Sequence, residues 1–108
     1  MAGTYDLDRS IAEHLGYRDI TLETFYYDDS LDAGQVDRLR GYLKGSLIWV
    51  PQWSTSANDA LELLKQVEGE IEITRTGYGN WLVRVNQMWG VGSSLPVAIC
   101  ELWLKVQK

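Results

Sequence analysis

Cysteine, histidine and proline are scarce in this chain of 108 residues, which has one Cys, one His and two Pro. Cys100 has no cysteine partner in the chain, which is typical of proteins in a reducing compartment. Zinc sites need paired cysteines or closely spaced histidines, and catalytic triads and dyads need a nucleophile beside a base such as histidine. Because His14 and Cys100 are single, we expect no metal site, no cofactor and no enzymatic activity.

Long apolar runs are also lacking, because the longest one covers only residues 47–50. A helix that crosses a membrane needs about 20 predominantly apolar residues in a row. No basic and apolar leader opens the sequence, which argues against secretion. We therefore expect a cytoplasmic protein that does not bind a membrane.

Basic residues are outnumbered, with ten Lys and Arg against fifteen Asp and Glu, and the formal net charge is −5. The excess is local, since residues 19–37 hold six acidic residues and no Lys or Arg. Such a chain lacks the positive charge that general binding to DNA or RNA requires. The acidic run fits a solvated loop, a loop that attracts metal, or a mimic of nucleic-acid charge. Its aspartates lack the spacing and the glycine of a calcium loop.

Aromatic residues are abundant by contrast, with five Trp and six Tyr beside one Phe. Trp and Tyr combine a large ring with a polar group and are favoured at interfaces and in ligand pockets. A small domain also buries Trp in its core. Both uses are open for the aromatic residues of this chain.

Apolar residues with helical spacing predict three helices. The first covers residues 5–17, with a cap at Thr4 and an end at Gly16. The second is capped by Ser54 or Ser56 and runs to about residue 67. Its expected buried stripe is Ala57, Ala60, Leu61, Leu64 and Val67.

The third helix is expected to begin at Ser93 or Ser94, with Pro96 in its first turn, where the missing N–H costs nothing. Its apolar face consists of Ala98, Ile99, Leu102 and Val106. Cys100 lies beside this face, which indicates a buried and inert thiol.

Strand patterns lie between these helices. Residues 20–27 are β-branched and aromatic, and residues 46–50 form a short apolar run before Pro51. Residues 70–77 and 81–88 alternate in polarity around turn residues, which predicts an antiparallel hairpin. Residues 31–43 predict a loop with two or three helical turns, weakened by two glycines, and residues 89–92 an irregular connection.

These elements predict one domain over residues 1–108 with an α+β fold. Three helices would pack on a small, mostly antiparallel sheet in the order helix, strand, strand, helix, hairpin, helix. An exposed sheet edge or aromatic patch would favour a homo-oligomer.

Four stretches occur in the order found in one known family. They are Leu-Asp-Arg-Ser-Ile-Ala-Glu at 7–13 followed by Gly-Tyr at 16–17, Val-Pro-Gln-Trp-Ser-Thr-Ser-Ala at 50–57, Gly-Asn-Trp-Leu-Val at 79–83, and Leu-Pro-Val-Ala-Ile-Cys at 95–100. Together they resemble the phage ABA sandwich domain, a family of small phage and prophage proteins. The resemblance implies a phage or prophage origin but no general biochemical function. Residues 19–45 are longer and more acidic than is typical of the family, so we expect any special role to lie there.

We expect a non-catalytic binding protein that counters host defence or inhibits another host process. It would either sequester a small nucleotide-like signal or mask a host protein. The alternative is an accessory protein with a structural, replication or assembly role in the phage. An enzyme would require His14 or paired carboxylates such as Glu70 and Glu72 to converge in a pocket.

Two sets of residues are candidates for binding. Aromatic rings that could stack on a base, and arginines that could hold phosphate, give the ligand-binding set Trp53, Arg75, Tyr78, Trp81 and Arg84. The acidic and aromatic segment gives the partner-binding set Tyr26, Tyr27, Asp28, Asp29 and Tyr42.

Overall fold

Three helices and two antiparallel sheets make up the computed structural model, which describes residues 2–29 and 32–107. This confirms the α+β class predicted from the sequence. The elements are α1 (Ala2–His14), β1 (Arg18–Asp29), β2 (Asp32–Leu43), β3 (Ser46–Trp49), α2 (Ala57–Leu64), β4 (Ile71–Arg75), β5 (Trp81–Val85), β6 (Met88–Gly92) and α3 (Leu95–Val106).

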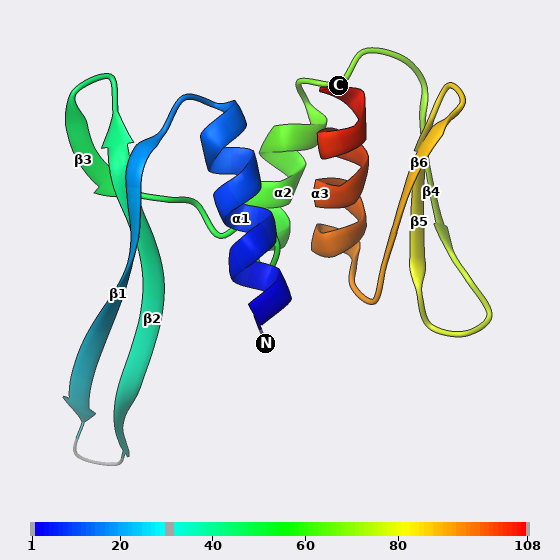
Figure 1. Cartoon of the computed structure of the whole chain (residues 1–108). Helices are drawn as coiled ribbons and strands as arrows, with labels where there is room; N and C mark the ends of the chain where they lie inside the picture. The colour runs from blue at the N-terminus through cyan, green and yellow to red at the C-terminus, as the bar shows by residue number, and fades with distance from the viewer. Residues whose placement is uncertain (1, 30–31, 108) are drawn as a thin grey trace.

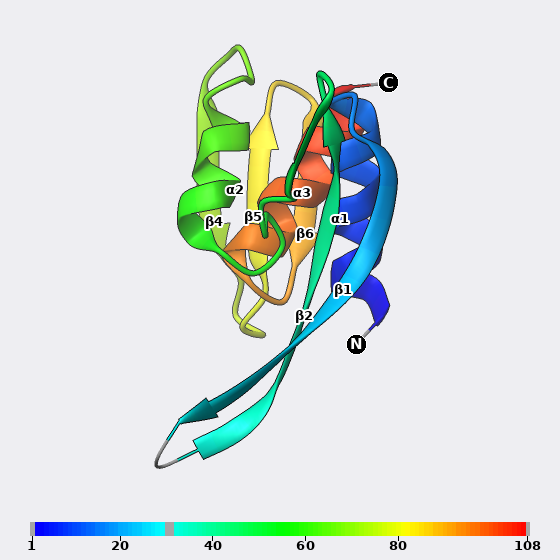
Figure 2. The same cartoon turned by 90° about the vertical axis from the view of Figure 1, so that its left-hand side faces the viewer.

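The strands that we expected in one sheet form two sheets. Sheet A has the strand order β1-β2-β3 and sheet B the order β4-β5-β6, and all neighbours are antiparallel. The helices lie between the two sheets, so that the layers run sheet, helices, sheet (Figures 1 and 2). Apolar side chains of the helical layer are therefore covered from both sides, which one small sheet could not do.

Residues 31–43 were expected as a loop with helical turns, and this expectation is wrong. Residues 32–43 form β2, the central strand of sheet A. Leu39 points inward and is buried, and Gly41 is the close-approach position, since a Cβ there would lie 3.1 Å from the carbonyl oxygen of Arg18. We read the glycine as a helix breaker, although it is needed for contact between strands.

Residues 89–92 were expected as an irregular connection, and they instead belong to β6, the third strand of sheet B. A two-residue turn joins β5 to β6, with Asn86 at a φ of 55°. Gly90 and Gly92 leave the space in which α3 packs directly on β6. The glycines that suggested irregularity therefore mark a close contact between helix and strand.

The helix ends follow the sequence signals in most places. Gly16, at a φ of 98°, ends α1 as expected, although α1 begins at Ala2 and so includes Thr4 rather than starting from it. The Ser56 side chain accepts a hydrogen bond from the backbone N–H of Asp59, and Ser94 caps α3 in the same way. Both serines were among the predicted caps.

The core lies within the helical layer and reaches both sheets. Trp103 and Ile11 are almost fully buried there, together with Leu39 of sheet A and Val83 of sheet B. The buried side chains of α2 are Ala60, Leu63 and Leu64. Leu61 was predicted in this stripe but is 40% exposed, because the helix turns the next position, Leu63, toward α3.

Candidate functional site

One face of sheet A carries no helix, and the distal part of its first hairpin extends beyond the rest of the molecule (Figures 1 and 2). We call residues 24–29 of β1 and 32–37 of β2 the arm; they form six directly paired positions from Thr24 and Asp37 to Asp29 and Asp32. Six positions span about 17 Å at 3.4 Å per residue. The radius of gyration is 15.3 Å, whereas a compact chain of this length has about 13 Å.

The arm is a two-stranded ribbon, because β3 pairs only with residues 40–43 of β2. Its base is fixed by a hydrogen bond from the Tyr5 hydroxyl to the carbonyl oxygen of Asp37, and by one of 2.7 Å from the Thr24 hydroxyl to the Asp37 carboxylate. A two-stranded ribbon without a packed face is only marginally stable in water. The arm therefore has unused binding capacity on both faces.

Apolar and aromatic side chains line the uncovered side of sheet A. Phe25 and Val36 are directly paired on this side and are 42% and 46% exposed. Phe25 packs edge-on against Trp49 of β3, with 4.8 Å between ring centroids. We call Phe25, Val36, Leu47 and Trp49 the outer face. A contiguous exposed apolar surface of this kind marks a site of association.

Two arginines complete the outer face. The guanidinium of Arg40 lies 4.9 Å from the ring centroid of Trp49, and that of Arg38 lies 5.6 Å from it. Arg40 also forms an ion pair of 3.3 Å with Glu23. These contacts fix the Trp49 ring in one orientation, so the outer face presents a preorganised aromatic surface rather than a mobile side chain.

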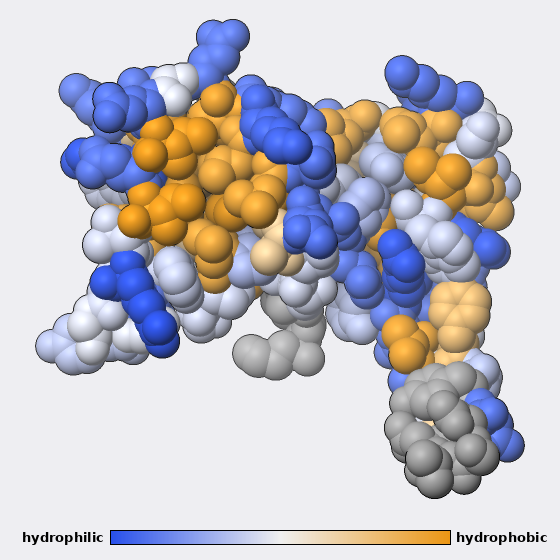
Figure 3. Space-filling view, turned by 180° about the vertical axis from the view of Figure 1, so that it is seen from behind, coloured by the Kyte–Doolittle hydropathy of each residue, from blue (hydrophilic) through white to orange (hydrophobic). Residues whose placement is uncertain are grey.

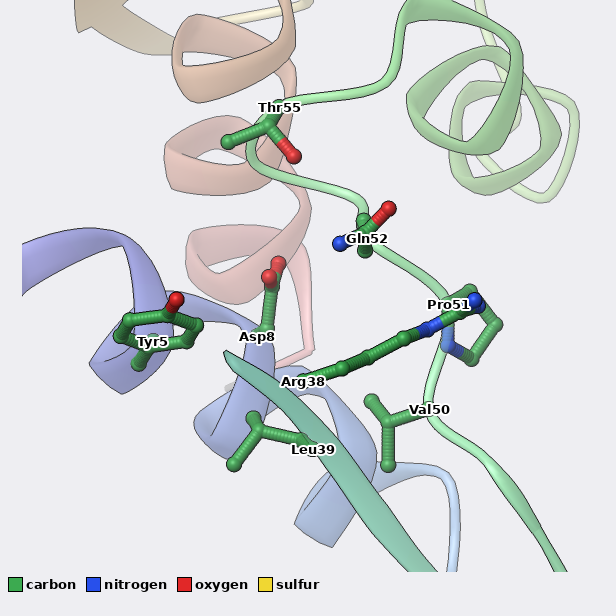
Figure 4. A pocket seen from close by; sticks show the side chains of 8 residues that line it. All are labelled: Tyr5, Asp8, Arg38, Leu39, Val50, Pro51, Gln52 and Thr55. Carbon is green, nitrogen blue, oxygen red and sulfur yellow. The ribbon is translucent and has the colours of Figure 1, made fainter. Parts of the chain in front are cut away.

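A small polar cavity lies behind the base of the arm, between α1, β2 and residues 50–55 (Figure 4). The Asp8 carboxylate points into it, and Arg38 extends along it toward Pro51. The backbone N–H of Ser54 donates a hydrogen bond of 2.8 Å to Asp8. With a volume of about 80 Å³, the cavity is far below the roughly 300 Å³ of the smallest ligand sites. It can hold water but not a nucleotide.

Burial raises the pKa of the Asp8 carboxyl to about 6, with a further increase from Asp59, while hydrogen bonds from Ser54 oppose the shift. The folded protein therefore holds the Asp8 proton at a pH where the unfolded chain, with a pKa near 3.9, has released it. The stability that protonated Asp8 provides is full below about pH 4 and is lost as the pH rises through about 6.

Asp8→Asn is expected to remove this cost. At pH 7 the variant should be more stable than the wild type by up to about 3 kcal/mol, since about two pKa units of 1.36 kcal/mol each no longer act against folding. The Asn oxygen still accepts the Ser54 N–H. Urea unfolding at pH 4 and pH 7 measures both values. A variant that is destabilised equally at both pH values would contradict the pKa shift.

The two residues with catalytic potential occupy structural positions. Cys100 is fully buried, and burial raises the pKa of its thiol well above the usual range, with smaller effects from Asp8 and Glu101. His14 lies edge-on to Trp103, with 6.1 Å between ring centroids. Within residues 2–29 and 32–107, no three His, Cys, Asp or Glu side chains are grouped to hold a metal ion.

The five predicted ligand-binding residues do not surround one cavity. Trp53 lies in the core, only 4% exposed and edge-on to Tyr17. The other four belong to the β4–β5 hairpin of sheet B: the Arg75 guanidinium lies 5.6 Å from the Trp81 ring centroid, Arg84 is ion-paired with Glu72, and Tyr78 lies in the turn.

Four of the five predicted partner-binding residues belong to the arm. Tyr26 is 80% exposed and Asp28 is exposed. Tyr27 and Asp29 are in β1, but their side chains lie outside the described part of the structure. Tyr42 belongs to the same sheet near its opposite end. The sequence analysis missed Phe25 and Trp49, although the strand patterns at 20–27 and 46–50 contained them.

A second apolar patch is visible on the rear face, at the end of the molecule formed by sheet B and α2 (Figure 3). Its exposed residues include Leu61 of α2 and Ile73 of the edge strand β4, which are 40% and 45% exposed. An exposed strand edge beside apolar side chains can accept a strand from another chain. The homo-oligomer that we expected from the sequence stays a prediction.

No family model, curated protein or solved structure matches this chain. The resemblance to the phage ABA sandwich domain therefore stays a prediction from the sequence. In the part of the chain that the structure describes, no helix has the length and apolar character required to cross a membrane.

Proposed function

We propose that this protein is a non-catalytic binding protein that masks a basic, partly apolar surface of another protein with the arm and the outer face. The observation that carries this proposal is the arm itself, which projects as a two-stranded ribbon with exposed Tyr26, Phe25 and Val36. Tyr and Phe anchors contribute much of the free energy in protein interfaces. The arm offers them where a partner can reach both faces.

The charge of the arm indicates the kind of partner. Residues 24–37 contain four acidic residues and no Lys or Arg. Complementary charge on a partner accelerates association and determines which surfaces bind. We therefore propose a partner with Lys and Arg around an apolar groove.

The proposed partner follows from the phage origin that the sequence resemblance implies. A host protein, masked so that host defence or another host process is inhibited, is the function that we propose. The alternative is a protein of the phage itself, bound during replication or assembly. Mass spectrometry of the protein bound to the arm decides between the two.

A charge reversal tests the electrostatic part of this proposal. Asp28→Lys is expected to weaken the complex with the captured partner by about 10-fold at low salt, because an attractive charge at the rim becomes repulsive. Glu70→Lys is the matched control, since Glu70 is an exposed acid before β4 and changes the net charge equally. Surface plasmon resonance at two salt concentrations measures both. Equal weakening by the two variants would exclude a specific contact with the arm.

A further inference from the structure

A hollow of about 630 Å³ lies at the end of sheet A opposite the arm tip, between the end of α1 and the turn from β2 to β3. Leu15 and Gly16 line one side, and Arg18, Tyr42 and Lys44 line the other. This volume falls within the range of about 300–1,000 Å³ in which small-molecule sites occur. The hollow is the largest of the described cavities, and it does not include the residues of the arm or the outer face.

Two basic side chains without a partner line this hollow. Arg18 and Lys44 make no hydrogen bond, ion pair or ring contact with any described residue. The other basic side chains of the described chain each have such a partner: Arg9, Arg38, Arg40, Lys65, Arg75, Arg84 and Lys105. In a chain of net charge −5, two unpaired cations at one cavity favour an anion there.

The third functional group is the ring of Tyr42. Arg18 and Tyr42 are directly paired across β1 and β2, which places them on the same side of the sheet. Tyr42 is 44% exposed, so its ring is available for stacking. Asp19, the only acidic residue that lines the hollow, can accept hydrogen bonds from sugar hydroxyls.

The backbone around the hollow is held in an uncommon conformation. Asp19 and Lys44 both have a φ of 52°, in the left-handed region that non-glycine residues seldom adopt. Such residues persist where the surrounding structure fixes them, and they are frequent at ligand sites. The cations at this end are therefore anchored on defined turns.

We propose that this hollow binds a nucleoside phosphate. Arg18 and Lys44 would hold the phosphate by charge-assisted hydrogen bonds, Tyr42 would stack on the base, and Asp19 would accept hydrogen bonds from the ribose. This site is separate from the arm, so it stands or falls independently of partner binding.

Isothermal titration calorimetry with AMP, adenosine and inorganic phosphate tests the site. AMP should bind at least 10-fold more tightly than either adenosine or phosphate, because only AMP engages the ring and the cations together. The double variant R18Q/K44Q should lose at least 10-fold in AMP affinity. Tyr42→Leu should weaken AMP binding and leave phosphate binding unchanged.

Matched controls separate a site from general charge. K65Q/R84Q removes two positive charges that are paired elsewhere and should leave AMP binding within 2-fold of the wild type. Tyr78→Leu removes an exposed tyrosine of sheet B and should also have no effect. The proposal is overturned if AMP does not bind at millimolar concentration, if phosphate alone binds equally well, or if both double variants have the same effect.

Discussion

Gly90→Ala is expected to lower the free energy of unfolding by at least about 3 kcal/mol, a large part of the roughly 5–15 kcal/mol of a small domain. A Cβ at position 90 would overlap the carbonyl oxygen of Ala98 and the backbone nitrogen of Leu102, and would lie 3.0 Å from the Cα of Leu102. These are backbone atoms of α3, which cannot turn aside as a side chain can. The helix would have to move away from β6 and from the core behind it.

Gly77→Ala is the control for this substitution. Gly77 lies in the turn between β4 and β5, and no atom lies within 4 Å of a Cβ placed there. Its stability should remain within about 0.5 kcal/mol of the wild type. Urea unfolding of both variants gives the two values, and a Gly90→Ala protein with wild-type stability would show that α3 does not pack on β6 as described.

Removal of the arm is expected to abolish partner binding while the rest of the molecule stays folded. We expect the affinity to fall by at least about 100-fold, or about 2.7 kcal/mol, because the exposed anchors of the arm are lost. The free energy of unfolding should change by less than about 2 kcal/mol, since the main loss is the hydrogen bond from Tyr5 to Asp37. Calorimetry and urea unfolding measure the two quantities.

The register of sheet A shows how to shorten the hairpin. The Val50 N–H donates to the carbonyl oxygen of Leu39, so the backbone of Leu39 faces the β3 side and that of Arg38 faces β1. Glu23 and Arg38 are therefore a hydrogen-bonded pair, as a two-residue turn requires. Replacing residues 24–37 by Asn-Gly joins this pair. An armless protein that binds its partner within 3-fold of the wild type would refute the role of the arm.

The sequence predicted the elements whose signals are local. The β4–β5 hairpin alternates in polarity around a turn with Gly79 at a φ of 82°, and the caps at Ser56 and Ser94 depend on a few neighbouring residues. β2 and β6 were missed because their glycines serve contacts with distant segments. Gly41 faces β1 and Gly90 faces α3, and neither contact can be deduced from nearby residues.

The candidate site was predicted in part for the same reason. Composition alone identified the acidic and aromatic segment that contains Tyr26 and Asp28. The contact between Phe25 and Trp49 joins β1 to β3 across a strand that we had interpreted as a loop, so the outer face could not be assembled. Trp53 illustrates the opposite case, because residue type suggested binding whereas its position is in the core.

Site-specific photo-crosslinking tests the central claim most directly. A benzophenone amino acid is placed at Tyr26 in one protein and at Tyr78 in another; both tyrosines are highly exposed, at 80% and 96%, but they lie on opposite sheets. Irradiation in an extract of the bacterial host should join the first protein to one partner, and excess wild-type protein should prevent this. Crosslinking only at position 78, equal crosslinking at both positions, or none at position 26 would contradict binding by the arm.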